Sequence, residues 1–189
     1  MSNKDVLEVV RRYGVIPVIA IDDVECALAL ADALIEGGLP VAEITFRTAA
    51  AAQVISKIAK ERPQVVLGAG TVLSAENVRR AKDAGALFGV APGVNPAVVK
   101  EAIRVGLPFV PGVVTPTEIE QALSMEAKIL KFFPAEAFGG LKVLKALAAP
   151  FAHLGVRFMP TGGITTANLG DYLCADIIAC VGGTWIASR

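Results

Sequence analysis

A lysine occupies the middle of an apolar segment, Ile129–Pro134. An apolar run of this length that ends at a proline is typical of a buried strand in a parallel sheet. Lysine is almost never fully buried unless it is paired, so Lys131 is unexpected there. Burial favours the neutral amine, which is a nucleophile that can form a Schiff base with a ketone. The alternative is a lysine whose stem lies on apolar surface while its ammonium group reaches solvent at the strand end.

A second group of reactive side chains lies in the segment Val41–Thr48. Strand alternation places Glu43, Thr45 and Arg47 on one face. Helices packed on a sheet cover its apolar side chains, so we expect this polar face to point into the interior of a barrel. Glu43 would then be a general acid and base, and Arg47 would bind a substrate carboxylate through two hydrogen bonds. The alternative is a structural ion pair between Glu43 and Arg47.

Three glycine-containing turns follow predicted strands: Gly68–Thr71, Thr161–Gly163 and Gly182–Thr184. In the first, the glycines would let the backbone approach a ligand, and Thr71 offers a hydroxyl. The other two follow the seventh and eighth predicted strands. Barrels often bind phosphate with the loops at these two positions, through backbone N–H groups. We therefore expect an anion site there; two ordinary turns are the alternative.

These segments need a frame that brings several strand ends together. Apolar runs alternate with helical patterns along the chain, after a short amphipathic helix at Lys4–Arg12. The predicted strands are Val15–Ala20, Val41–Phe46, Val65–Gly70, Leu87–Ala91, Phe109–Val113, Ile129–Phe133, Arg157–Pro160 and Ile177–Val181. Strict alternation implies parallel strands, and this number of strands fits an α/β fold of the closed (β/α)8 TIM-barrel type. A doubly wound open sheet is the competing architecture, but no Gly-x-Gly-x-x-Gly follows the first strand.

A chain of 189 residues suits one domain, and we predict a single domain over residues 1–189. Its last predicted strand, Ile177–Val181, is apolar on both faces, and no eighth outer helix follows it before Arg189. Without that helix we expect outward side chains to meet water, each at a cost of roughly 1.5–3 kcal/mol. Unless the N-terminal helix or a neighbouring subunit covers the strand, we expect the native polypeptide to continue past Arg189.

The composition argues against several classes of binding partner. Eighteen basic and eighteen acidic residues cancel, which argues against binding to nucleic acid or to an anionic membrane. No run approaches the roughly 18 apolar residues of a membrane helix. The three cysteines, Cys26, Cys174 and Cys180, form no Cys-x-x-Cys pair, so we expect buried reduced thiols in a cytosolic protein and no metal site. The only histidine, His153, is expected at the surface or as a helix cap.

Five segments in one order carry a resemblance over almost the whole chain: Glu43–Thr48, Gly68–Leu73, Lys131–Glu136, Pro160–Ile164 and Gly182–Trp185. Together they resemble the signature segments of the 2-keto-3-deoxy-6-phosphogluconate (KDPG) aldolase family, which also cleaves 4-hydroxy-2-oxoglutarate (KHG). The sequence departs from the family's usual pattern at Ala91 and Thr184, where serine is common. Thr184 keeps a hydroxyl, whereas Ala91 removes a polar group beside Pro92.

The resemblance implies a cytoplasmic, homotrimeric class I aldolase of carbohydrate metabolism, in the Entner–Doudoroff pathway, that needs no cofactor. Its reaction would cleave the phosphorylated keto acid to pyruvate and glyceraldehyde 3-phosphate, and KHG to pyruvate and glyoxylate. Lys131 resembles the Schiff-base lysine and Glu43 the proton shuttle. The residues implied to bind substrate are Arg47, Thr71, Pro92, Phe133, Thr161, Gly162, Gly163, Gly182, Gly183 and Thr184. The alternatives are another phosphosugar enzyme that uses Lys131 only as a charge, and a non-catalytic assembly scaffold.

Overall fold

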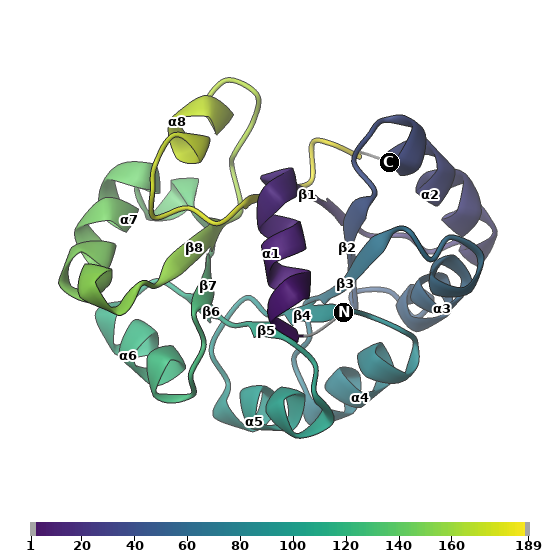
Figure 1. Cartoon of the computed structure of the whole chain (residues 1–189), viewed down its shortest axis with the longest axis horizontal. Coiled ribbons are helices and arrows are strands. Elements are labelled where there is room, and N and C mark those ends of the chain that lie inside the picture. The colour runs from purple at the N-terminus through teal and green to yellow at the C-terminus, as the bar shows by residue number, and fades with distance from the viewer. Residues whose placement is uncertain (1–2, 188–189) are drawn as a thin grey trace.

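The computed structural model of the protein describes residues 3–187. Parallel strands alternate with helices, and the helices form an outer layer around the strands (Figure 1). The strands are β1 (Val15–Ile19), β2 (Val41–Thr45), β3 (Val66–Gly70), β4 (Phe88–Val90), β5 (Phe109–Val110), β6 (Gly112–Val113), β7 (Ile129–Phe132), β8 (Arg157–Pro160) and β9 (Val181–Gly183). The α-helices are α1 (Asn3–Tyr13), α2 (Ala27–Glu36), α3 (Ala51–Glu61), α4 (Ala75–Asp83), α5 (Pro96–Val105), α6 (Pro116–Ser124), α7 (Gly140–Ala148) and α8 (Leu169–Leu173). Short 3₁₀ helices cover Val24–Cys26, Glu136–Phe138 and Ala149–Leu154.

The strands form a curled parallel sheet in two pieces. One has the order β5-β4-β3-β2-β1-β9 and the other the order β6-β7-β8. Only Pro111 separates β5 from β6 in the chain. On the other side, isolated parallel bridges join Phe158 to Ile178 and Thr161 to Gly182. The chain at Pro111 and these two bridges therefore link the two pieces, and the carboxyl ends of all the strands lie at the same end of the molecule.

Two predicted strands differ from the observed ones. The expected strand Phe109–Val113 is interrupted at Pro111, because proline has no N–H group to donate to a neighbouring strand. The expected strand Ile177–Val181 is wrong in its bounds, since β9 begins only at Val181. Ile178 donates its N–H to the carbonyl of Ala175 in a turn at 2.9 Å, so this part of the run keeps only a single bridge to β8.

Helix α1 covers one end of the strands. Its apolar side chains Val6 and Val10 belong to the same buried cluster as Ile16, Val41 and Val66, which lie near the beginnings of β1, β2 and β3. In Figure 1, α1 accordingly lies across the middle of the molecule, within the circle of outer helices. Because α1 covers the amino ends of the strands, a ligand would enter at their carboxyl ends.

The last predicted strand, Ile177–Val181, is less exposed to water than its sequence predicted. Val181 and Cys180 are at most 1% exposed, and Ile178 is 9% exposed. Tyr172 of α8 shares an apolar cluster with Ile178 and Val181, whereas Cys180 packs in the cluster that contains α1. The expectation of a costly exposed face was therefore wrong for these residues, and the expectation about the chain past Arg189 lies outside the described residues.

The cysteines also depart from expectation. Cys26 and Cys174 are exposed and only Cys180 is buried, although all three are free thiols. Cys26 ends a 3₁₀ helix and Cys174 follows the last residue of α8, positions that turn both thiols toward solvent. His153 is exposed, as predicted. Among residues 3–187, no helix combines the length and the apolarity needed to cross a membrane.

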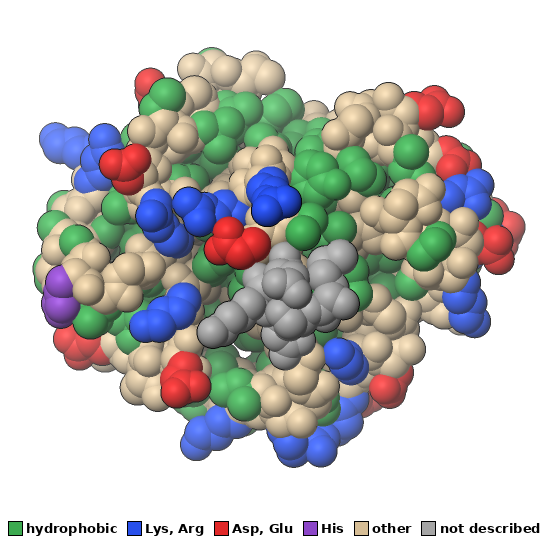
Figure 2. All heavy atoms as spheres, in the orientation of Figure 1, with side chains coloured by type: hydrophobic (Ala, Val, Ile, Leu, Met, Phe, Trp, Pro, Cys, Tyr) green, Lys and Arg blue, Asp and Glu red, His purple; other side chains and the backbone are tan. Residues whose placement is uncertain are grey.

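Acidic and basic side chains are intermixed on the surface. On the face shown in Figure 2, basic and acidic groups lie among one another, in keeping with their equal numbers in the sequence. Glu101 accepts hydrogen bonds from both Arg79 and Arg104, which lower the pKa of its carboxyl from 4.5 to about 2. Exposed pairs of this kind contribute little to stability, so the charged surface does not define the fold.

Candidate active site

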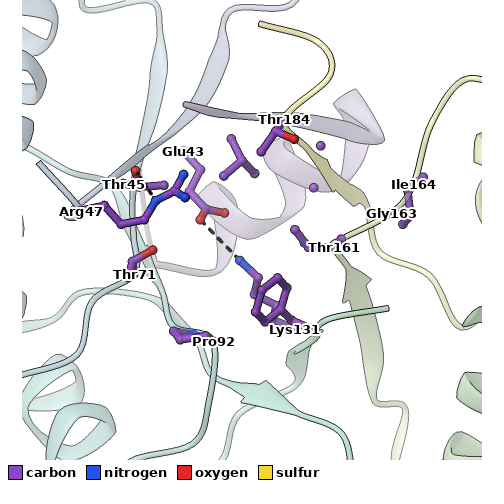
Figure 3. A pocket seen from close by; sticks show the side chains of 15 residues that line it. Glu43, Thr45, Arg47, Thr71, Pro92, Lys131, Thr161, Gly163, Ile164 and Thr184 are labelled. Carbon is purple, nitrogen blue, oxygen red and sulfur yellow. Dashed lines mark hydrogen bonds and ion pairs between the residues drawn. The ribbon is translucent and has the colours of Figure 1, made fainter. Parts of the chain in front are cut away.

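A pocket of about 430 Å³ opens at the carboxyl ends of the strands. All twelve residues that the sequence analysis predicted for the site line it, although they come from six different strand ends or the loops after them. Figure 3 shows their side chains converging on the cavity. The complete lining is Val18, Glu43, Thr45, Arg47, Thr71, Pro92, Lys131, Phe133, Thr161, Gly162, Gly163, Ile164, Gly182, Gly183 and Thr184.

The centre of the pocket is a buried pair of opposite charges. Glu43 of β2 is 0% exposed and Lys131 of β7 is 6% exposed. Nζ of Lys131 donates to Oε1 of Glu43 at 3.5 Å, and Oε2 of Glu43 has no hydrogen-bond partner within the described chain (Figure 3). Buried charged groups normally have hydrogen-bond partners, so the free oxygen of Glu43 is available to a ligand. A carboxylate in this position, beside a nucleophilic amine, can exchange a proton with a bound molecule.

This pair differs from both structural alternatives that the sequence left open. Lys131 does not extend to solvent, because its ammonium group ends inside the pocket beside Glu43 and 5.4 Å from the centre of the Phe133 ring. Glu43 forms its ion pair with Lys131, and no ion pair joins Glu43 to Arg47. The pair can form because β2 and β7 face each other across the pocket.

Arg47 lies past the end of β2, at the mouth of the pocket. Its Nε donates to the hydroxyl of Thr45 at 3.2 Å, and that hydroxyl donates to the carbonyl of Ile19 at 3.2 Å. No described carboxylate lies within 4.0 Å of the guanidinium, whose two terminal nitrogens are left for a ligand. A guanidinium in this state suits a planar carboxylate, which it can bind through two hydrogen bonds.

Thr71 reaches the pocket through an unusual backbone conformation. Its φ is +55°, in the left-handed region that is costly for a β-branched residue. The conformation follows directly on β3 and places the threonine on the pocket wall (Figure 3). Strain of this kind persists where the surrounding structure imposes it, as at ligand-binding positions.

The glycines before Thr71 serve a different purpose from the one predicted. Neither Gly68 nor Gly70 lines the pocket. A side chain at Gly68 would overlap the ring of Phe88, and one at Gly70 would overlap the carboxylate of Glu43. These glycines therefore make room for neighbouring side chains and do not bring backbone to a ligand. Ala91 likewise lies outside the pocket lining, although Pro92 is part of it.

The loop after β8 and the end of β9 form the wall opposite Arg47 and Thr71 (Figure 3). The expected turn at Gly182–Thr184 is wrong in its bounds, because Gly182 and Gly183 pair with β1 as part of β9. Gly162 and Gly163 have φ values of +101° and +79°, which only glycine adopts readily, and their N–H groups donate no hydrogen bond within the described chain. The bridge between Thr161 and Gly182 holds this loop against β9, which Thr184 follows. The Oγ1 atom of Thr161 is buried without a partner. The wall therefore presents hydrogen-bond donors, as an anion site requires.

Three lining residues were not among the predicted site residues. Strand alternation places Thr45 on the correct face, but it indicates no role for the threonine hydroxyl. Val18 is an apolar member of β1, and Ile164 follows the glycine pair; neither carries a signal that distinguishes it from core. In the part of the chain that the structure describes, no cluster of three or more His, Cys, Asp or Glu side chains is placed to hold a metal ion.

Comparison with known proteins agrees with this site. The sequence model of the family described as KDPG and KHG aldolase matches residues 6–189. The 2-dehydro-3-deoxy-phosphogluconate aldolase of Haemophilus influenzae is 46% identical over 188 residues, which cover 100% of this chain and 88% of that protein. The KHG/KDPG aldolase of Escherichia coli K12 is 44% identical over 172 residues, covering 91% of this chain and 80% of that protein.

A solved structure gives the same result. The KDPG aldolase of Legionella pneumophila, with pyruvate captured as a covalent carbinolamine intermediate, superposes with a TM-score of 0.92 and 38% identity. The superposition covers 100% of this chain and 89% of that one. The resemblance expected from five short segments is confirmed over the whole chain: the protein belongs to the KDPG and KHG aldolase family.

Proposed function

We propose that this protein is a class I aldolase that cleaves 2-dehydro-3-deoxy-6-phosphogluconate to pyruvate and glyceraldehyde 3-phosphate, and 4-hydroxy-2-oxoglutarate to pyruvate and glyoxylate. The observation that carries the proposal is a buried lysine whose Nζ lies 3.5 Å from a fully buried carboxylate inside an open pocket. The covalent pyruvate adduct described for the Legionella relative supports the same chemistry here.

The reaction begins when the Lys131 ammonium group gives up a proton to water in the open pocket and the neutral amine attacks the C2 ketone of the substrate. The hydroxyl of the resulting carbinolamine takes up a proton from the same water before it leaves. The carbinolamine loses water to give a protonated imine, which withdraws electrons from the C3–C4 bond. Glu43 accepts the proton of the C4 hydroxyl as that bond breaks, so the aldehyde leaves and an enamine remains. Glu43 then returns a proton to C3 of the enamine, and water hydrolyses the imine to release pyruvate and regenerate the amine. One carboxylate serves as base and then as acid because it stays beside the lysine throughout.

The two ends of the substrate use opposite walls of the pocket. Arg47 and Thr71 bind the carboxylate next to the reacting ketone, with Pro92 and Phe133 packing against the carbon chain. The phosphate binds at the other wall, where the residues are Thr161, Gly162, Gly163, Gly182, Gly183 and Thr184. Support comes from the free terminal nitrogens of the guanidinium on one side and the unbonded N–H groups of the glycine pair on the other.

We propose further that residues 1–189 form one domain and that the curled sheet closes into a (β/α)8 barrel. The ladder between β1 and β9 supports closure, as do the bridges from Phe158 to Ile178 and from Thr161 to Gly182. Assembly into a homotrimer and a cytoplasmic location stay predictions from the family resemblance.

Borohydride reduction in the presence of pyruvate tests the central step. We expect irreversible inactivation and a mass increase that maps to Lys131, because the reagent reduces an imine to a stable amine. A coupled assay for pyruvate release should detect cleavage in the wild type and none in Lys131→Ala. Cleavage without an adduct would indicate an enzyme that uses Lys131 only as a charge, and neither adduct nor cleavage would indicate a non-catalytic scaffold.

A further inference from the structure

The hydroxyl group of Thr45 takes part in two hydrogen bonds inside the site. Thr45 is 1% exposed and lies at the end of β2, between Glu43 and Arg47 on the same face of the strand. Its Oγ1 lies 3.2 Å from the carbonyl oxygen of Ile19 and 3.2 Å from Nε of Arg47. Figure 3 shows the threonine beside the guanidinium, on the side away from Lys131.

The directions of these two bonds are determined by the groups involved. A carbonyl oxygen can only accept and an arginine nitrogen can only donate. The single proton of Thr45 must therefore point at Ile19, and its lone pair must face Nε of Arg47. Because the hydroxyl has no freedom to reverse, the Nε edge of the guanidinium is held against the strand.

Occupation of Nε decides which edge of Arg47 can meet a ligand. A guanidinium binds a carboxylate through two parallel N–H groups, either side-on through Nε and one terminal nitrogen or end-on through both terminal nitrogens. With Nε bonded to Thr45, the side-on mode is blocked and the end-on mode remains. Arg47 is otherwise exposed, so this bond is also its only described hydrogen bond to the protein.

We propose that Thr45 is a positioning residue for substrate recognition, which orients Arg47 so that its two terminal nitrogens bind the carboxylate of the keto acid end-on. The inference rests on the proposed role of Arg47 as the carboxylate ligand. Thr45 does not touch the reacting atoms and acts through the arginine. Its loss should weaken the capture of a keto acid without slowing the chemical steps on Lys131.

The neighbouring Thr48 provides a matched control. Its hydroxyl donates to the main-chain carbonyl of Ile21, two residues past the end of β1, at 2.8 Å. It makes no described hydrogen bond to Arg47 and does not line the pocket. Thr45→Val and Thr48→Val therefore each remove one hydroxyl that ties the same two segments together, but only the first removes the contact with the guanidinium.

The experiment measures borohydride trapping as a function of pyruvate concentration in the wild type, Thr45→Val, Thr45→Ser, Thr48→Val and Arg47→Ala. In Thr45→Val we expect the half-saturating concentration of pyruvate to rise roughly 3- to 10-fold, since the arginine must now be ordered by the ligand itself. The trapping rate at saturation should change little. Thr45→Ser should restore the wild-type value, and Thr48→Val should resemble the wild type.

Trapping with acetone, a ketone without a carboxylate, separates positioning from general damage to the pocket. Thr45→Val should trap acetone as fast as the wild type, because no carboxylate has to be recognised. Equal losses with acetone and pyruvate, or equal losses in Thr45→Val and Thr48→Val, would overturn the proposal. If thermal unfolding shows that Thr45→Val does not fold, Thr45→Ala takes its place with the same expectations.

Arg47→Ala distinguishes failure of this inference from failure of the proposed function. If Arg47→Ala raises the half-saturating pyruvate concentration and Thr45→Val does not, the arginine binds the carboxylate without the help of Thr45, and the positioning role is wrong. If Arg47→Ala has no effect, the carboxylate binds elsewhere, and both the role of Arg47 and this inference fall together.

Discussion

Gly70 leaves open the space that the carboxylate of Glu43 occupies. A Cβ atom added at Gly70 would lie 2.6 Å from Cγ and 2.7 Å from Cδ of Glu43. Real side chains do not approach so closely, so any larger residue at this position must displace the carboxylate. The two residues come from adjacent strands, β3 and β2, and this relationship places Glu43 beside Lys131.

Gly70→Ala should therefore impair proton transfer while leaving imine formation possible. We expect cleavage to fall by roughly 10²-fold or more, the contribution typical of a positioned general acid or base. Borohydride trapping with pyruvate should persist, as it should in Glu43→Gln. Gly170→Ala is the matched control, because a Cβ there meets nothing within 4 Å. Wild-type cleavage in Gly70→Ala would mean that the position of Glu43 is not critical.

The buried ion pair predicts a stability effect of Lys131→Ala. An unpaired lysine could be removed without leaving a charge behind, but Lys131 is paired with Glu43, which is 0% exposed. Breaking a buried pair leaves its partner uncompensated, at a cost of about 3–5 kcal/mol, and we expect the lower end because water can enter the vacated pocket. Denaturant unfolding of Lys131→Ala should show this loss together with the loss of cleavage.

The double variant Glu43→Gln/Lys131→Ala identifies the origin of that loss. It removes both charges, so it should regain most of the free energy of unfolding that Lys131→Ala loses, while staying inactive. A double variant no more stable than Lys131→Ala would show that lost packing of the lysine stem, and not the orphaned carboxylate, accounts for the change.

The three thiols should differ sharply in reactivity. Burial, and then the negative charge of Glu43, raise the pKa of Cys180 from 9.0 to about 12, and the side chain is also inaccessible. Asp23 raises the pKa of exposed Cys26, through charge repulsion and a hydrogen bond. Because the thiolate is the nucleophile, alkylation near pH 8 should modify Cys174 first, Cys26 more slowly and Cys180 only after unfolding.

Cys180 also predicts a dependence of stability on pH. Its pKa is higher in the folded protein than in the unfolded chain, so the folded state retains a proton that the unfolded chain gives up. This contribution is fully present below about pH 9 and is lost as the pH rises toward about 12. The free energy of unfolding of Cys180→Ala should change less with pH over that range than that of the wild type. An identical profile would assign the alkaline loss of stability to other groups.

Thr184→Val should separate the two proposed substrates. The variant keeps the shape of the side chain and removes the hydroxyl at the phosphate wall of the pocket. A hydrogen bond to a charged group is worth enough that KM for the phosphorylated substrate should rise roughly 10-fold or more. KM for 4-hydroxy-2-oxoglutarate, which has no phosphate, should change little. Equal effects on both substrates would place the phosphate elsewhere.

Local patterns in the sequence were sufficient to predict the alternation of strands and helices. They also predicted the face of the strand on which Glu43, Thr45 and Arg47 lie. These features depend on the two-residue period of a strand and on where apolar runs stop, and both are properties of neighbouring residues. They also predicted that the chemically active side chains would gather at the carboxyl ends of parallel strands. The twelve predicted site residues share one pocket for that reason.

Only the tertiary structure decided which of these residues pair. Glu43 could have bonded to Arg47, four residues further along the chain, or to Lys131, 88 residues away. The curl of the sheet turns β7 toward β2 and makes the distant pair, while Thr45 holds the arginine aside. The space that Gly70 leaves for Glu43, and the cover that Tyr172 provides for the last strand, also depend on packing between strands and helices far apart in the chain. Such contacts have no period along the sequence, because they depend on how complete elements fit together.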